Sequence, residues 1–183
     1  MIMNNCTIYF IRHATPDWSR KDLPYYIEPG PPLTKQGEAE AAELGLFLQG
    51  IGIQYLLVSP LQRCQETAAI AAENSGISWS TEELIREWQP DENQSDVGNR
   101  MKELLNDVKE KNGNGCKIGL VTHGGPIAVG LELLGMEREE ITSNRIYDHK
   151  NPVPPAGIWC AEQIGENSDW EFKLVFAPNH RYS

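Results

Sequence analysis

Short apolar runs recur along the chain and alternate with segments of helical periodicity. Residues 7–11 (TIYFI), 55–58 (YLLV) and 117–122 (KIGLVT) are rich in β-branched, aromatic and aliphatic residues. Runs of this length, with almost no polar interruption, are typical of strands that are covered on both faces. The pattern therefore predicts three buried strands.

Apolar residues at helical spacing follow each strand, and glycines mark the helix ends. Thr34 has the side chain of a helix N-cap and precedes a Glu/Ala-rich stripe, which stops near Gly50 and Gly52. Gly76 closes an alanine-rich stretch in the same way. Pro126 suits the first position of a later helix. The predicted helices run from Thr34 to about Gly50, from 63 to 74, from about 95 to 112, and from Gly124 to about Gly135.

The C-terminal pattern is different. Residues 158–165 (IWCAEQIG) and 170–177 (WEFKLVFA) flank a turn-like segment at 166–169, which predicts a hairpin at a sheet edge. Strands that alternate with helices favour a parallel sheet between two helical layers. The sequence therefore predicts an α/β protein, a three-layer α/β/α sandwich with a mostly parallel central sheet and an antiparallel edge strand near the C-terminus.

Composition and charge narrow the functional classes. The 183 residues, 40% hydrophobic and 23% charged, fit one globular domain over residues 1–183. Acidic residues outnumber basic ones by 26 to 16, and no Lys/Arg run occurs, so nucleic acid is not expected as a partner. The net charge of −10 also opposes long-range attraction of anions, so any phosphate chemistry needs a local cluster of cations.

Targeting signals and cysteines point to one compartment. The N-terminus has no basic region followed by a long apolar stretch, and the chain has no apolar run of 18 residues, so neither export nor membrane insertion is expected. The four cysteines are far apart in sequence and form no CxxC pair, which favours reduced thiols. We therefore predict a cytoplasmic protein whose oligomeric state the sequence leaves open.

Basic side chains occur at equivalent places after the predicted strands. Arg12 and His13 end the first strand, Arg63 begins the helix after the second, and His123 ends the third. In open α/β sheets ligands bind at this carboxyl edge. Two guanidinium groups match the oxygens of a phosphoryl group, and the amides of Gly124 and Gly125 at a helix start add further donors. A neutral histidine can then attack phosphorus and divide one displacement into two.

Four blocks of the chain resemble the histidine phosphatase superfamily, which has the phosphoglycerate mutase-like fold. They are FIRHATPDW with His13, PLTKQGEAEA, SPLQRCQETA around Arg63, and VTHGGPI around His123. The blocks cover most of residues 7–135 in the order and rough spacing of that family. The resemblance implies a phosphoric monoester hydrolase that needs neither metal nor other cofactor.

The resemblance also implies a role for each matched residue. His13 is the expected nucleophile that becomes phosphorylated, while Arg12, Arg63 and His123 are expected to bind the phosphoryl group. His123 is further expected to stabilise charge in the transition state. Glu87, in LIREW, is the best match to the carboxylic acid that protonates the leaving oxygen and activates water. The residues alone leave Glu82, Glu83, Glu87 and Glu92 open for this role.

We thus predict a metal-independent phosphatase that acts on a phosphomonoester through a phosphohistidine at His13. A phosphorylated small molecule is the expected substrate, with a phosphoprotein as the alternative. A phosphoglycerate-type mutase and a catalytically weak relative that binds a phosphoprotein remain alternative functions. Thr15 and Ser19 depart from the mutase pattern, and Ala14 replaces the glycine usual after the histidine.

The surroundings of the predicted site are less defined. The loop over 16–32 is interpreted as a wall of the substrate site, with a plain surface loop as the alternative. The residues expected to form this wall are Trp18, Arg20, Lys21, Tyr25 and Tyr26. His149 and His180 have no accompanying motif, so we expect both to face solvent. A zinc site built from His13, His123 and a carboxylate is disfavoured, because the neighbouring arginines repel a cation.

Overall fold

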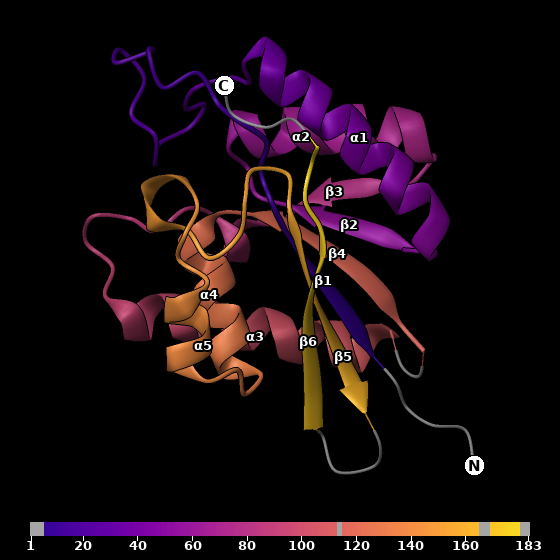
Figure 1. Cartoon of the computed structure of the whole chain (residues 1–183). Helices are drawn as coiled ribbons and strands as arrows, with labels where there is room; N and C mark the ends of the chain where they lie inside the picture. The colour runs from indigo at the N-terminus through magenta and orange to yellow at the C-terminus, as the bar shows by residue number, and fades with distance from the viewer. Residues whose placement is uncertain (1–5, 113–114, 165–168, 180–183) are drawn as a thin grey trace.

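One mixed sheet of six strands runs through the structure in the order β3-β2-β4-β1-β5-β6 (Figure 1). The computed structural model describes residues 6–112, 115–164 and 169–179. The first four strands are parallel, β5 runs antiparallel to β1, and the edge strand β6 runs antiparallel to β5. They are β1 (Thr7–Arg12), β2 (Tyr55–Val58), β3 (Trp79–Thr81), β4 (Lys117–Thr122), β5 (Ile158–Ile164) and β6 (Asp169–Phe176). The predicted α/β fold with its antiparallel C-terminal edge is confirmed.

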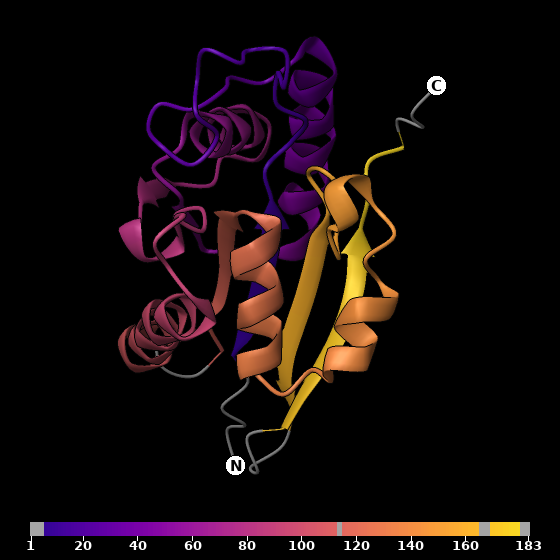
Figure 2. The same cartoon turned by 90° about the vertical axis from the view of Figure 1, so that its left-hand side faces the viewer.

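Helices cover both faces of the sheet (Figures 1 and 2). Alternate residues of β1 face the two layers: Ile8 and Phe10 belong to one buried cluster, whereas Tyr9 and Ile11 belong to the other. α1 (Lys35–Ile51) and α2 (Gln62–Ser75) cover one face, while α3 (Gln94–Asn112), α4 (Gly124–Leu133) and α5 (Arg138–Ser143) cover the other. None of the helices in the described ranges is long and apolar enough to cross a membrane.

The predicted helix ends agree with the capping chemistry. The hydroxyl of Thr34 accepts a hydrogen bond from the Gly37 amide at 3.0 Å and so starts α1. Gly52 and Gly76 end α1 and α2 in the left-handed conformation that glycine adopts without steric cost. α4 begins at Gly124, so Pro126 occupies its third position and not the predicted first one.

Several short elements were not predicted from the sequence. They are β3, the 3-10 turns η1 (Glu83–Ile85) and η2 (Asp148–Lys150), and α5. Each has at most six residues, which is too short for a helical or alternating period to emerge. The two strands of the predicted C-terminal hairpin pair as expected, whereas most of its proposed turn, 166–168, lies outside the described residues.

The turn that follows β1 is fixed by contacts with α1. Glu40, which is buried, accepts hydrogen bonds from the Thr15 amide and from the Thr15 hydroxyl, both at 2.8 Å. Gly37 lies so close to the Thr15 carbonyl that a Cβ at this position would overlap it. The backbone just after His13 is therefore held against the start of α1, which leaves the histidine little freedom to move.

Candidate active site

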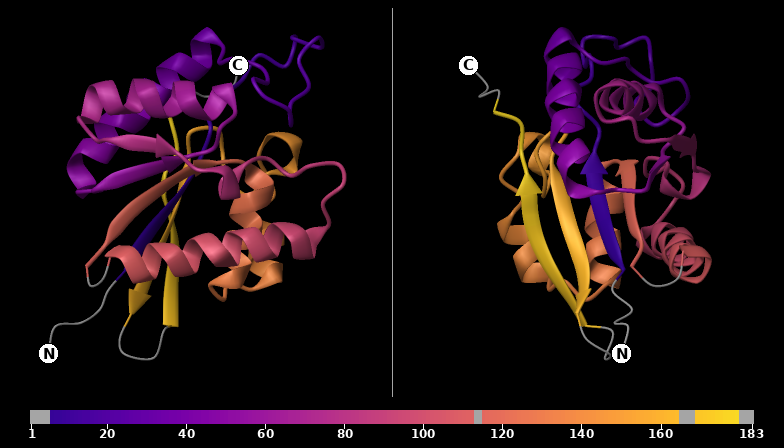
Figure 3. Two further views of the ribbon diagram at one scale, coloured as in Figure 1. Left: turned by 180° about the vertical axis from the view of Figure 1, so that it is seen from behind. Right: turned by 90° about the vertical axis from the view of Figure 1, so that its right-hand side faces the viewer.

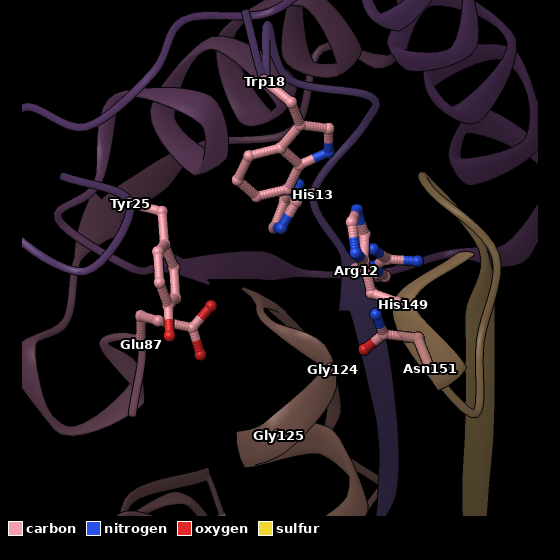
Figure 4. A pocket seen from close by; sticks show the side chains of 9 residues that line it. All are labelled: Arg12, His13, Trp18, Tyr25, Glu87, Gly124, Gly125, His149 and Asn151. Atoms are coloured by element: carbon pink, nitrogen blue, oxygen red, sulfur yellow. The ribbon is translucent and has the colours of Figure 1, made fainter. Parts of the chain in front are cut away.

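The carboxyl ends of the parallel strands surround one cavity of about 430 Å³ (Figure 4). Residues at the ends of β1 and β4 line its base, and residues of the long loop before α1 and of the segment before β5 line its outer part. Figure 3 shows these two segments at the same end of the sheet. The residues that line it are Arg12, His13, Trp18, Tyr25, Glu87, Gly124, Gly125, His149 and Asn151. Four of the predicted site residues are among them, while Arg63 and His123 are buried against the cavity wall.

His13 is held as one neutral tautomer. Its Nδ1 lies 2.8 Å from the Ala14 carbonyl oxygen, which can only accept, so the ring proton sits on Nδ1. Nε2 then carries a lone pair, and it has no hydrogen-bond partner in the described part of the chain. Burial, followed by the positive charges of Arg63 and Arg12, lowers the pKa of His13 well below 6.5. The imidazole is therefore neutral and nucleophilic at neutral pH.

Arg12 is oriented by a carboxylate that the sequence pattern did not single out. Its Nη1 and Nη2 donate to the two oxygens of Asp148 at 2.6 and 2.8 Å, and Nη1 also donates to the Val153 carbonyl at 3.0 Å. A guanidinium group has five N–H donors, so these contacts leave the Nε–H and one Nη2–H. Asp148 thus fixes Arg12 in place and leaves one edge of its guanidinium group available to another anion.

Unpaired donors are concentrated on the two arginines. In the described ranges, the side-chain nitrogen and oxygen atoms that are themselves shielded from solvent and have no hydrogen-bond partner all belong to these arginines: Arg12 Nε, Arg63 Nε and Arg63 Nη1. Leaving a buried donor unpaired costs about 1–3 kcal/mol, and more when the group is charged. Such donors beside a cavity are typical of a site for a bound anion, which supplies the missing acceptors.

His123 lies behind His13, with 5.3 Å between the ring centroids. Its Nδ1 accepts a hydrogen bond from Arg63 Nη2 at 3.1 Å, because guanidinium groups only donate. The ring proton is then on Nε2, which donates to the Ser59 hydroxyl at 2.8 Å. Burial and the nearby arginines lower the pKa of His123 well below 6.5. His123 is therefore a second neutral imidazole, and it helps to orient Arg63.

Glu87 is the carboxylate beside these groups. Its Oε2 lies 3.2 Å from Arg63 Nη2 and 3.4 Å from His123 Nδ1, and its Oε1 accepts a hydrogen bond from the Trp88 amide. Burial raises the pKa of Glu87 above 4.5, although Arg63 opposes this shift. Of the four glutamates left open by the sequence, all of which are described, Glu87 is the one that lines the cavity.

The start of α4 forms the floor of the cavity. Gly124 and Gly125 are in the first helical turn, where backbone N–H groups have no acceptor within the helix. A Cβ on Gly124 would overlap the side-chain oxygen of Asn151, so glycine permits this close approach. Asn151, which also lines the cavity, was missed by the sequence analysis because no local pattern connects it with Gly124.

Aromatic rings close the outer part of the cavity. Trp18 makes edge-to-face contacts with Tyr25 and His149, with ring centroids 6.4 and 5.4 Å apart. Of the five loop residues expected to form this wall, Trp18 and Tyr25 line the cavity, whereas the other three do not. His149 is exposed, as expected, but it also lines the cavity, while His180 lies outside the described residues. His149 and Lys150 both adopt positive φ, a conformation that costs non-glycine residues about 1–3 kcal/mol and is common at functional sites.

A cluster of metal-ligating side chains is not found in the described part of the chain. The described residues contain no group of three or more His, Cys, Asp or Glu side chains arranged to hold a metal ion. The expectation of a metal-independent reaction stays a prediction, which rests on the two arginines beside His13.

Sequence comparison places the chain among known proteins. Residues 8–95 match the model of the histidine phosphatase superfamily (branch 1). A probable phosphoglycerate mutase, GpmB of Klebsiella pneumoniae subsp. pneumoniae, is 31% identical over 80 residues, which are 44% of this chain. The match spans 37% of the length of that curated relative. The family predicted from the four sequence blocks is therefore confirmed.

Solved structures share the fold over nearly the whole chain. A mycobacterial glucosyl-3-phosphoglycerate phosphatase has a TM-score of 0.71 and 18% identity, covering 93% of this chain and 98% of its own. A phosphoglycerate mutase from Bacillus anthracis str. Sterne has a TM-score of 0.74 and 18% identity, with coverages of 95% and 94%. At this level of identity the comparison shows the fold alone.

Proposed function

We propose that this chain, which belongs to branch 1 of the histidine phosphatase superfamily, hydrolyses a phosphomonoester through a phosphohistidine formed on His13. One observation carries the proposal. His13, with a free nitrogen on its neutral ring, and Arg12, with an unpaired buried donor, line the same cavity. Arg63, which also has unpaired buried donors, contacts the lining residue Glu87 from behind the cavity wall. This combination offers a nucleophile and an anion clamp in one place.

In the first step, the lone pair on His13 Nε2 attacks phosphorus in line with the leaving oxygen. The bond between phosphorus and that oxygen breaks, and the oxygen takes a proton from the carboxyl group of Glu87. Arg12, Arg63 and the Gly124 amide donate hydrogen bonds to the phosphoryl oxygens and so stabilise their negative charge. His123 holds Arg63 in position by accepting a hydrogen bond from it. The products are an alcohol and a phosphohistidine.

In the second step, the Glu87 carboxylate accepts a proton from a water molecule, which attacks phosphorus. The phosphorus–nitrogen bond breaks, its electron pair returns to Nε2, and inorganic phosphate leaves. Glu87 regains its proton and His13 its neutral state. Burial raises the pKa of Glu87, which favours the protonated carboxyl group that the first step needs as its acid.

The charges around the cavity favour hydrolysis over mutase chemistry. A phosphoglycerate mutase must also bind the carboxylate of its substrate, whereas Arg12 is the one lysine or arginine among the nine lining residues. We therefore expect a panel of phosphomonoesters to release inorganic phosphate and 3-phosphoglycerate not to be isomerised. Phosphate release and phosphoglycerate isomerisation, measured on the same preparation, check this. Isomerisation faster than phosphate release would assign the mutase function.

Replacing Asp148 by asparagine is expected to raise KM about tenfold and to change kcat by less than about threefold. Without the ion pair, Arg12 keeps its hydrogen bond to Val153 but is held less firmly for the phosphoryl group. In the proposed mechanism it contacts that group equally in the ground state and in the transition state, so the loss falls on KM. Steady-state kinetics of D148N measure this split. D107N, which breaks an exposed ion pair with Lys111 on α3, is the control. A fall in KM would show instead that Asp148 competes with substrate for Arg12.

A further inference from the structure

The aromatic rings at the mouth of the cavity form a wall for the part of the substrate that is not phosphate. Trp18, Tyr25 and His149 come from two segments far apart in sequence, yet all three line the same cavity. We refer to them as the aromatic rim. Trp18 contacts both other rings edge to face, at interplanar angles of 73°. Aromatic pairs prefer such edge-to-face or offset arrangements with centroids about 4.5–7 Å apart. An aromatic ring of a substrate could make the same kind of contact with the rim.

The rim lies where the leaving group must be. Figure 4 shows Tyr25 on the same side of the cavity as Glu87, with Arg12, His149 and Asn151 on the opposite side and Trp18 beside His13. Because Glu87 is the proposed donor to the leaving oxygen, the alcohol portion of the substrate departs towards Glu87 and Tyr25. Trp18 also lies over the buried Arg63, with 6.0 Å from the guanidinium carbon to the ring centroid. The rim therefore borders the phosphoryl site directly.

The residues that line the cavity offer no second lysine or arginine to pair with an anionic group on the leaving alcohol. Arg12 is the one lysine or arginine among the lining residues, and Asp148 and the phosphoryl group together use its donors. Glu87 is the only carboxylate among them. A carboxylate or second phosphate on the leaving group would enter the cavity without a cation to pair with, which is costly.

We propose that the aromatic rim selects phosphomonoesters whose leaving group is an uncharged alcohol bearing a planar aromatic ring. This inference rests on the proposed function, since it concerns the leaving group of that reaction. A cavity of about 430 Å³ is within the range that holds small molecules. Stacking and edge-to-face contacts with Trp18 and Tyr25 then favour a planar ring over an aliphatic one of similar size.

Two matched substrates test the proposal. 2-Phenylethyl phosphate and 2-cyclohexylethyl phosphate have similar length and leaving oxygens of similar basicity, so their ratio of kcat/KM reports the ring alone. We expect the wild type to favour the phenyl compound about 3- to 10-fold. The cyclohexyl compound is the more hydrophobic of the two, so a merely apolar wall would give a ratio of one or less. For 3-phosphoglycerate we expect kcat/KM at least about tenfold below that of the phenyl compound.

Variants of the rim test whether these residues cause the preference for the phenyl compound. Trp18→Leu and Tyr25→Leu should bring the phenyl-to-cyclohexyl ratio close to one, whatever their effect on overall rate, because the ratio cancels a loss common to both substrates. Tyr55→Leu, at the start of β2 and lining a different cavity, is the matched control and should keep the wild-type ratio. A ratio that stays unchanged in both rim variants overturns the proposal.

The outcomes separate this inference from the proposed function. Equal hydrolysis of the two substrates by the wild type, lost in His13→Ala, would overturn the aromatic preference and leave the phosphohistidine mechanism intact. Faster hydrolysis of 3-phosphoglycerate than of the phenyl compound would likewise overturn it, in favour of a site for anionic leaving groups. Hydrolysis that persists unchanged in His13→Ala would instead overturn the proposed function.

Discussion

His13→Ala is expected to lower kcat for any good substrate by about 10⁴-fold or more, because it removes the only atom that receives the phosphoryl group in the proposed mechanism. Nε2 of His13 is placed for this role by the Nδ1 contact with Ala14, and the low pKa of the ring keeps it unprotonated. Phosphate release in steady state measures the loss. A radiolabelled substrate should also mark the wild type with phosphate that is stable in alkali and released by acid, and H13A should carry no label.

A second measurement separates lost chemistry from lost folding. H13A keeps Arg12, Arg63 and the Gly124 amide, so it should bind inorganic phosphate with a Kd within about tenfold of the wild type, measured by calorimetry. The site is buried, and removing one neutral ring leaves a small cavity without an unpaired charge. Turnover close to the wild-type rate in a variant that binds phosphate would contradict the phosphohistidine mechanism.

Much of the fold could be predicted because the pattern of the chain is locally consistent. The runs around Ile8, Leu56 and Leu120 are strands, and Thr34, Gly52 and Gly76 bound helices as their capping chemistry requires. A residue at the end of a parallel strand lies at the carboxyl edge of the sheet whatever the strand order, so Arg12, His13 and His123 could be placed together without the structure.

The parts that were missed depend on contacts between distant residues. Asp148 is 136 positions from Arg12, and nothing around it has the period of a helix or strand. Asn151 contacts Gly124, and His149 contacts Trp18, in the same irregular segment. Local spacing carries no information on which loops meet, so only the folded structure brings these side chains to the cavity.

The location of the charges also explains how an acidic protein can hold an anion. The net charge of −10 is spread over the whole chain, whereas Arg12 and Arg63 are almost fully buried beside the cavity. Inside a protein the effective dielectric constant is lower than in water, so a few nearby guanidinium groups outweigh many distant, screened carboxylates. The expectation of a local cluster of cations therefore agrees with the structure.

Glu87→Gln is expected to lower kcat/KM for an alkyl phosphate by about 10²- to 10⁴-fold, because glutamine has the shape of glutamate but cannot supply a proton to the leaving oxygen. For 4-nitrophenyl phosphate, whose leaving group is stable as an anion, we expect a loss of less than about tenfold, since the first step then needs little proton transfer. Glu83→Gln, an exposed carboxylate four residues earlier that does not line the cavity, is the control.

The pH dependence of kcat/KM tests whether Glu87 is the acid, because an acid catalyst gives a limb that falls as pH increases. In the wild type, kcat/KM should rise as pH increases through the lowered pKa of His13, where the nucleophile loses its proton. It should then fall as pH increases through the raised pKa of Glu87, where the acid loses its own proton. E87Q should keep the first limb and lose the second. An equal loss with both leaving groups, together with an unchanged falling limb, would show that another group protonates the leaving oxygen and that Glu87 only positions Arg63.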